Sequence, residues 1–295
     1  MYISVLFDIL KLAGIYVTMG LGFVMIYRAS RVINLSQPGL IMLGAFLALA
    51  YLPKPDGGAS SSPEFWLISG GLIAVGGLLG FVIYTLLIKP MAGNPRISIV
   101  LMTLAALFMF EAVIDIVWPG QRGFLALPGN TAAYEVFGSR VRLFDIVPFI
   151  VGLGIWAGVT VFYRWSRIGI RIRAVAENAG LAARRGINID RVGAVSWCLA
   201  GAVAVVAGLM VGTQGPVSAL VVATALKGFS VALVGGLDSV AGLLPAAALV
   251  AGSEVITVRF IDQQFGEAIP FVVLMIVLLI KPWGLAGTVE ELDRV

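Results

Sequence analysis

The chain contains no histidine, and its 295 residues include a single cysteine, Cys198, and only 12% charged residues. Without histidine, the sequence lacks the commonest metal ligand and the side chain that most often transfers protons near neutral pH. One cysteine cannot form a disulfide framework or a thiol metal cluster. No pairing of a nucleophile with a base is recognisable either, so an enzyme active site is not expected.

Apolar residues are abundant: they make up 60% of the sequence, and the mean hydropathy is +1.02. They form runs close to the roughly 20 helical residues that cross about 30 Å of hydrocarbon. The first run holds Lys11 and no cleavage signal follows it, so it is expected to be a retained span. The sequence predicts an all-α, polytopic membrane helical bundle of about eight or nine spans, in one domain over residues 1–295. The runs cover 5–27, 33–52, 65–88, 97–118, 143–163, 192–212, 217–236, 239–258 and 268–281.

The placement of lysine and arginine predicts the orientation of the spans. The breaks at 28–31, 89–96 and 164–191 hold eleven basic residues, whereas the intervening loops at 53–63 and 119–142 hold four. Basic loops remain in the cytoplasm, which predicts an external N-terminus and, with four later spans, a cytoplasmic C-terminus. The formal charge of +4 is not gathered on one basic face, so no nucleic-acid partner is expected.

The run 217–236 differs from the others because Lys227 lies in its middle and a glycine pair ends it. This pattern predicts a discontinuous or re-entrant helix near 217–258. Non-helical backbone at membrane depth must line a cavity or contact other protein. We therefore expect the break to line a solute pathway, with Gly235, Gly236, Asp238 and Ser239 as contacts.

Three pairs of glycines lie four residues apart within apolar runs. This spacing lets two helices approach closely, although glycine is frequent enough here for some pairs to arise by chance. The pairs are Gly76 and Gly80, Gly154 and Gly158, and Gly208 and Gly212.

Polar side chains within the apolar runs are candidates for solute contact, because burying them in hydrocarbon is costly. Asn34, Ser36 and Gln37 lie where the second run begins. Their amide and hydroxyl groups suit a zwitterionic or amide solute, and the alternative is that Asn34 or Ser36 caps a helix. Glu111 and Asp115 lie one turn apart in the fourth run. They form either a carboxylate pair for cation coupling or an ordinary interhelical contact.

Lys227 and Glu254 are two further charges within apolar runs. They can neutralise each other if their segments pack antiparallel. Alternatively, they serve as coupling groups.

A polar, arginine-rich segment, residues 164–191, separates the fifth and sixth runs. Val175, Ala179 and Ala182 follow helical spacing there, which predicts a short surface helix with one small apolar face. Gly186 is typical of the residue that ends a helix. The segment is either a docking surface for a soluble partner or a basic loop that only fixes orientation.

The same segment carries a family resemblance. It reads Gly169-x-Arg171-x-Arg173-Ala174, then Glu177-Asn178, Ala182 and Gly186-Ile187-Asn188. This pattern resembles the coupling loop of permeases in the branched-chain amino acid uptake family of ABC importers, and residues 229–242 and 281–287 are similar to later landmarks of that family. Leu35–Gly39 departs from the family pattern, as does Pro245. The resemblance implies ATPase coupling by Arg171, Arg173, Ala174, Glu177, Asn178, Ala182, Ala183, Arg184, Arg185, Gly186 and Ile187.

Membership of that family implies a multi-subunit importer in the bacterial cytoplasmic (inner) membrane. Its other parts are a second homologous permease, two subunits that bind ATP-Mg, and an extracytoplasmic solute-binding protein. The sequence has no Gly-x-x-x-x-Gly-Lys-Ser/Thr phosphate loop, so ATP is expected on the partners and no cofactor on this chain. The expected solute is a branched-chain or other amino acid, with urea, amides and small organic acids as related substrates.

The alternative is a self-sufficient secondary transporter or channel. In that case Glu111, Lys227 and Glu254 are the coupling or selectivity groups, and transport needs no ATPase.

Overall fold

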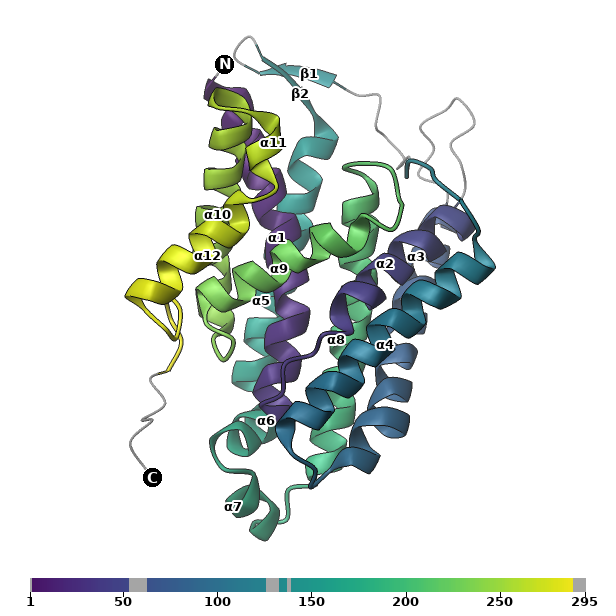
Figure 1. Ribbon diagram of the computed structural model, residues 1–295, viewed down its shortest axis with the longest axis vertical. Coiled ribbons are helices and arrows are strands. Elements are labelled where there is room, and N and C mark those ends of the chain that lie inside the picture. The colour runs from purple at the N-terminus through teal and green to yellow at the C-terminus, as the bar shows by residue number, and fades with distance from the viewer. Residues whose placement is uncertain (1, 53–62, 126–132, 137–138, 289–295) are drawn as a thin grey trace.

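The computed structural model describes residues 2–52, 63–125, 133–136 and 139–288, most of which are helical (Figure 1). In chain order the elements are α1 (Tyr2–Ser30), α2 (Gln37–Tyr51), α3 (Pro63–Ile83), the π-helix η1 (Tyr84–Ile88), the 3₁₀ helix η2 (Lys89–Met91), α4 (Arg96–Val117), β1 (Ala133–Val136), β2 (Ser139–Arg142), α5 (Leu143–Trp165), α6 (Arg167–Glu177), α7 (Ala179–Arg184), α8 (Ile189–Gly212), α9 (Val221–Gly235), α10 (Val240–Phe260), α11 (Gln263–Gly266) and α12 (Ile269–Ile280). Among the described residues, six helical segments are long and apolar enough to cross a membrane: α1, α3 with η1 and η2, α4, α5, α8 and α10. The predicted polytopic helical bundle is confirmed.

Three further apolar helices, α2, α9 and α12, have 15, 15 and 12 residues. At about 1.5 Å per residue they are shorter than the roughly 30 Å hydrocarbon layer. The predicted spans 33–52 and 217–236 are therefore only partly helical, since α2 begins at Gln37 and α9 at Val221. Protein covers the irregular backbone before α9, where the Val217 N–H donates to the Gly123 carbonyl at 2.8 Å.

The predicted discontinuity near 217–258 is present. Helix α9 ends at Gly235, Gly236 has φ +98°, and α10 begins at Val240. A φ of this kind is strained for residues with a Cβ, so glycine is the residue that permits the turn.

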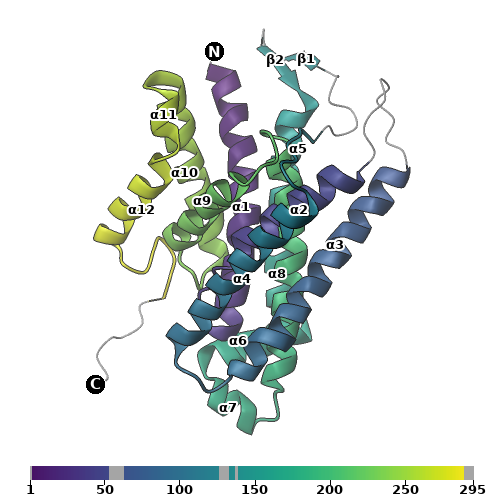
Figure 2. The same ribbon diagram turned by 45° about the vertical axis from the view of Figure 1, so that its right-hand side comes forward.

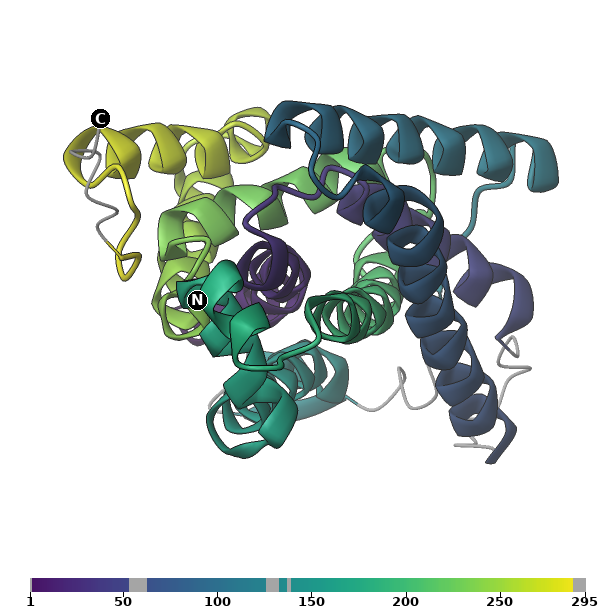
Figure 3. The ribbon, with the colours of Figure 1, turned by 90° about the horizontal axis from the view of Figure 1, so that it is seen from below.

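Helix α1 lies at the centre of the bundle and packs against α5, α8, α9 and α10 (Figure 3). Helix α8 packs in turn against α1, α2 and α3. Helices α4 and α12 are peripheral: α4 lies against α2, and α12 lies against α9 and α10 (Figure 2). The centre of the molecule is thus built from α1 and α8 together with the short helices α2 and α9.

Close helix contacts explain the pair Gly76 and Gly80 and one member of a second pair, Gly208, whereas a Cβ on Gly212 would lie 2.1 Å from the Leu125 side chain, outside the helices. A Cβ on Gly80 of α3 would lie 2.1 Å from the Trp197 carbonyl oxygen of α8, and one on Gly76 would lie 2.6 Å from the Gly201 oxygen. On the α2 side of α8, a Cβ on Gly208 would lie 2.3 Å from a carbonyl oxygen of α2. These distances are far below van der Waals contact, so only glycine allows the helices to approach so closely.

The third pair behaves differently. A Cβ on Gly154 or Gly158 of α5 would have no atom within 4 Å. The predicted packing role of this pair is therefore wrong within the described chain, because this face of α5 is directed away from the other helices.

The two ends of the bundle are unlike each other. Helices α6 and α7 form one end, and the hairpin β1–β2 lies at the other with α11 and the start of α1 (Figure 1). The hairpin pairs Ala133 with Arg142 and Val136 with Ser139, which adds two short strands to a region expected only as loop. After α12 the chain returns to the junction of α9 and α10 through residues 281–288, the tail segment.

Candidate functional site

Helices α6 and α7 form a compact surface unit. Ile172, Val175 and Ala182 are buried beneath it, each at most 5% exposed. The Arg31 guanidinium, which follows α1, donates to the Ala176 carbonyl of α6 from Nη2 at 3.2 Å and from Nε at 3.4 Å. The unit is thereby bonded directly to the end of the central helix.

The junction with α5 is equally close. A Cβ on Gly169 would lie 2.3 Å from the Phe162 carbonyl oxygen, so α6 folds back tightly on the last turns of α5. Ser166 starts α6 by accepting the Gly169 N–H at 2.8 Å, as an N-cap residue does.

The single surface helix predicted in this segment is in fact two helices. Asn178 has extended backbone angles, which end α6, and its side chain accepts the Leu181 N–H at 2.8 Å to start α7. The break turns Ala179 out to solvent, so the predicted face shared by Val175, Ala179 and Ala182 is wrong at Ala179. Gly186, with φ +78°, follows the end of α7 as predicted.

The predicted coupling residues are mostly accessible. Ala182 is buried and Ala174 and Ile187 are half-buried, so these three fix the unit to the bundle. The outer surface offers both charges, an amide and small side chains to a partner. The exposed members are Arg171, Arg173, Glu177, Asn178, Ala183, Arg184, Arg185 and Gly186.

Asn34, Ser36 and Gln37 form a buried polar cluster at the start of α2, each at most 1% exposed. Asn34 Oδ1 accepts the Ser36 N–H at 3.0 Å and the Ser36 hydroxyl at 2.6 Å, and Asn34 Nδ2 donates to Gln37 Oε1 at 3.3 Å. Gln37 Nε2 also donates to the Ala200 carbonyl of α8 at 3.2 Å. Ser36 is the N-cap residue of α2 but its side chain makes no cap hydrogen bond, and Asn34 bonds the Ser36 N–H just ahead of the helix, so neither side chain caps α2 as the alternative expects. The whole cluster is bonded to protein in this conformation.

The glycine break after α9 is covered by the tail segment. The N–H groups of Leu285 and Ala286 donate to the carbonyls of Val234 at 2.7 Å and Gly235 at 3.2 Å, which are acceptors left over at the end of a helix. Gly235 and Gly236 are both buried. In this conformation the tail segment covers this backbone, and a role for Gly235 and Gly236 in solute contact stays a prediction.

Asp238 and Ser239 also have partners within the chain. The Asp238 carboxylate accepts the Thr288 N–H at 3.0 Å and the Thr288 hydroxyl. Ser239 caps α10 by accepting the Gly242 N–H at 3.1 Å.

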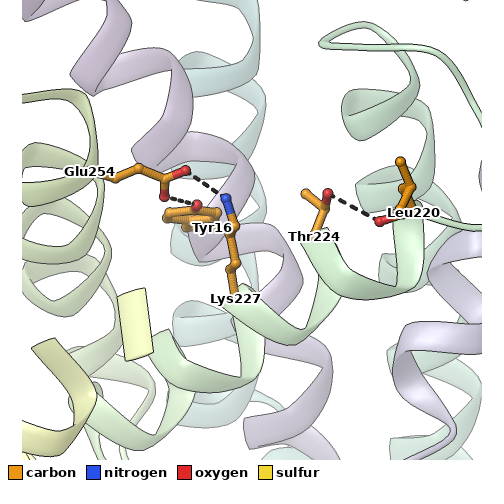
Figure 4. A network of polar contacts seen from close by, with 5 residues as sticks. All are labelled: Tyr16, Leu220, Thr224, Lys227 and Glu254. Atoms are coloured by element: carbon orange, nitrogen blue, oxygen red, sulfur yellow. Dashed lines mark hydrogen bonds and ion pairs between the residues drawn. The ribbon is translucent and has the colours of Figure 1, made fainter. Parts of the chain in front are cut away.

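Lys227 and Glu254 meet, with Nζ 2.7 Å from Oε1 and both side chains largely buried (Figure 4). The hydroxyl of Tyr16, on α1, donates to the other carboxylate oxygen of Glu254. This network joins α1, α9 and α10 and confirms the pairing that the sequence left open. Tyr16 was missed, since a tyrosine within an apolar run carries no signal that distinguishes it from core.

Glu111 and Asp115 lie apart from these groups. Both are on the peripheral helix α4, Glu111 half-buried and Asp115 exposed. Within the described residues, no hydrogen bond or ion pair joins Glu111 to the polar cluster at α2 or to Lys227.

The comparison of the sequence with protein families identifies the family to which the chain belongs. The family described as the permease component of branched-chain amino acid transport systems matches residues 5–278. The chain belongs to this family of permeases. The predicted membership is confirmed, and this permease is a multi-pass membrane protein.

Individual relatives match the permease over nearly its whole length. It is 25% identical to the high-affinity branched-chain amino acid transport system permease protein LivH of Salmonella typhimurium, over 98% of this chain and 96% of the relative. It is 26% identical to the corresponding protein BraD of Pseudomonas aeruginosa, over 98% and 97%. A probable branched-chain amino acid transport permease of Methanocaldococcus jannaschii is also 26% identical, over 93% and 89%. No solved structure is significantly similar to the chain.

Proposed function

We propose that this permease is the translocating subunit of an ATP-binding-cassette importer in the bacterial cytoplasmic membrane. Its solute is a branched-chain or other small amino acid, as the names of its relatives suggest. Its partners are a second homologous permease, two ATP-binding subunits and an extracytoplasmic solute-binding protein. The absence of a phosphate-loop motif from the sequence supports an energy source on another polypeptide.

The observation that carries this proposal is the attachment of α6 and α7 to the central helix. Their outer surface is exposed, whereas Arg31 bonds α6 to the end of α1 and Gly169 packs it against α5. A force applied to this unit by an ATPase therefore reaches α1 directly. Helix α1 in turn holds α9 and α10 through Tyr16, so movement at the surface is transmitted to the centre of the bundle.

The polar cluster of Asn34, Ser36 and Gln37 is the proposed solute contact. Its groups are bonded to one another and to α8 here, so the solute has to replace these bonds rather than fill a vacant site. We infer that the cluster opens when α2 and α8 separate, which breaks the close contact of Gly208 with α2. A zwitterionic amino acid supplies both donors and acceptors for this exchange.

Charge reversal on the surface unit tests the coupling role. Glu177→Lys is expected to lower binding-protein-stimulated ATP hydrolysis of the assembled transporter at least tenfold, because it changes the surface offered to the ATPase. Glu267→Lys is the matched control: this residue is also exposed but lies beside α11 at the hairpin end. Equal ATPase activity in the two variants and the unmodified transporter would contradict the proposal.

A secondary transporter or channel remains the second candidate because Tyr16, Lys227 and Glu254 form a charged network within the apolar bundle. Such a protein moves solute without an ATPase. Solute uptake into ATP-free vesicles that contain this chain alone distinguishes the two, since the importer gives no uptake and the secondary transporter does.

A further inference from the structure

A pocket of about 540 Å³ lies near the α6–α7 end, where α1, α5, α6 and the start of α10 meet. Three arginines line it, Arg28 from α1, Arg164 from α5 and Arg173 from α6. One carboxylate, that of Asp238, also lines it and already accepts hydrogen bonds from Thr288. Among the described residues, three positive charges therefore face one negative charge.

Arg28 is the least solvated of these arginines. It is half-buried, and its guanidinium carbon lies 4.9 Å from the centre of the Tyr163 ring. Among the described residues, no carboxylate lies within ion-pair distance of Arg28. Asp238 attracts this guanidinium across the pocket without an ion pair, so Arg28 retains donors for an anion, and planar guanidinium groups suit phosphate well.

Two further features favour an anion in this pocket. Val240 and Ala241, in the first turn of the 21-residue helix α10, line it, and the N-terminal end of a helix carries partial positive charge. The hydroxyl of Tyr163, another lining residue, is buried and has no hydrogen-bond partner among the described residues. It leaves one donor available beside the arginines.

We propose that this basic pocket binds the phosphate group of an anionic membrane lipid. The pocket lies at the basic end of the spans, where the headgroups of the cytoplasmic leaflet are expected, and basic pockets between helices on that side bind such headgroups. An apolar hollow lined by Leu233, Leu278 and Trp283 shares Asp238 and Thr288 with it, which suits an amphipathic ligand better than free phosphate. The bound lipid joins α1, α5, α6 and α10 and stabilises the attachment of α6 to the bundle. This inference is independent of the proposed transport function.

The test uses the purified full-length chain, native mass spectrometry and titration with phosphatidylglycerol or phosphatidylcholine. Phosphatidylglycerol is expected to bind more tightly. Arg28→Gln together with Arg164→Gln should weaken its binding about 25-fold, at about fivefold for each arginine. Arg122→Gln with Arg259→Gln, two exposed arginines outside the pocket, is the matched control and should leave binding unchanged.

Further variants keep the test decisive if the double variant does not fold. Arg164→Gln alone, at an exposed position, should weaken phosphatidylglycerol binding about fivefold. Asp238→Asn should strengthen it, because this change removes the opposing charge and keeps an acceptor for Thr288. Equal binding of the two lipids, or equal loss in the pocket and control variants, overturns the proposal. Displacement of phosphatidylglycerol by millimolar inorganic phosphate, with the same dependence on the arginines, supports the anion pocket but assigns it to free phosphate.

Discussion

Lys227 and Glu254 bring opposite charges together inside an apolar bundle, where their side chains are 13% and 11% exposed. Each charge stabilises the other in the buried setting, and the Tyr16 hydroxyl donates a further hydrogen bond to Glu254. Removing one partner leaves an uncompensated buried charge, whereas removing both avoids that penalty.

Lys227→Met is therefore expected to lower the free energy of unfolding by about 3 kcal/mol, and Lys227→Met with Glu254→Met to recover most of the loss. Unfolding by sodium dodecyl sulfate in mixed micelles measures both variants. Additive losses in the double variant would show that the two charges do not stabilise each other.

At the junction of α9 and α10, a segment distant in the chain supplies hydrogen-bond donors to the end of a helix. Helix α9 ends with carbonyl groups that no residue of α9 can bond, and Leu285 and Ala286 supply the missing donors. A Cβ on Gly236 would lie 2.6 Å from the Gly287 nitrogen, so the turn and the tail segment fit together only with glycine.

Gly236→Ala is expected to displace the tail segment, because it adds backbone strain of about 1–2 kcal/mol and a clash with Gly287. Hydrogen–deuterium exchange should then become faster at Leu285 and Ala286. Gly93→Ala is the control, since Gly93 has nearly the same φ, +95° against +98°, but no atom within 4 Å of its Cβ position. Unchanged exchange at Leu285 and Ala286 in Gly236→Ala would show that the tail segment does not need glycine at position 236.

At the scale of the whole molecule, the arrangement of the ends predicts which surface faces the cytoplasm. With Cys198 replaced by alanine, Gly180→Cys in α7 should react with an impermeant maleimide only in inside-out vesicles. Glu267→Cys, at the hairpin end, should react in intact cells. Labelling of Gly180→Cys in intact cells would show that α7 faces the exterior, and α7 could then not be a docking surface for an ATPase.

Sequence alone predicts most of this architecture, because a membrane span needs a long apolar run and each of the nine runs corresponds to a helix of the described part. The exact starts of α2 and α9 are not predictable in this way. They depend on distant partners: Thr103 Oγ1 accepts the Leu35 N–H at 3.0 Å, and the Gly123 carbonyl accepts the Val217 N–H. Neither partner has a local signal in the sequence.

The local structure of the α6–α7 segment can likewise be predicted from the sequence, but its tertiary contacts cannot. The α6–α7 segment is local, so its helical character and its end at Gly186 follow from spacing, and the coupling role expected of its residues from the resemblance stays a prediction. The cover over Gly235 and Gly236 comes from residues some fifty positions later, and no pattern within either segment indicates that they meet.

The contact between the tail segment and the α9–α10 junction has a consequence for biosynthesis. Residues 283–288 leave the ribosome after all the described helices have been made, so the α9–α10 junction can be covered only after α12 has been synthesised. A premature stop codon just before Trp283 would keep all the described helices and yet leave the carbonyl groups at the end of α9 without the donors of Leu285 and Ala286. In such a truncated product the α9–α10 junction stays exposed, so we expect membrane proteases to degrade it faster than the full-length protein.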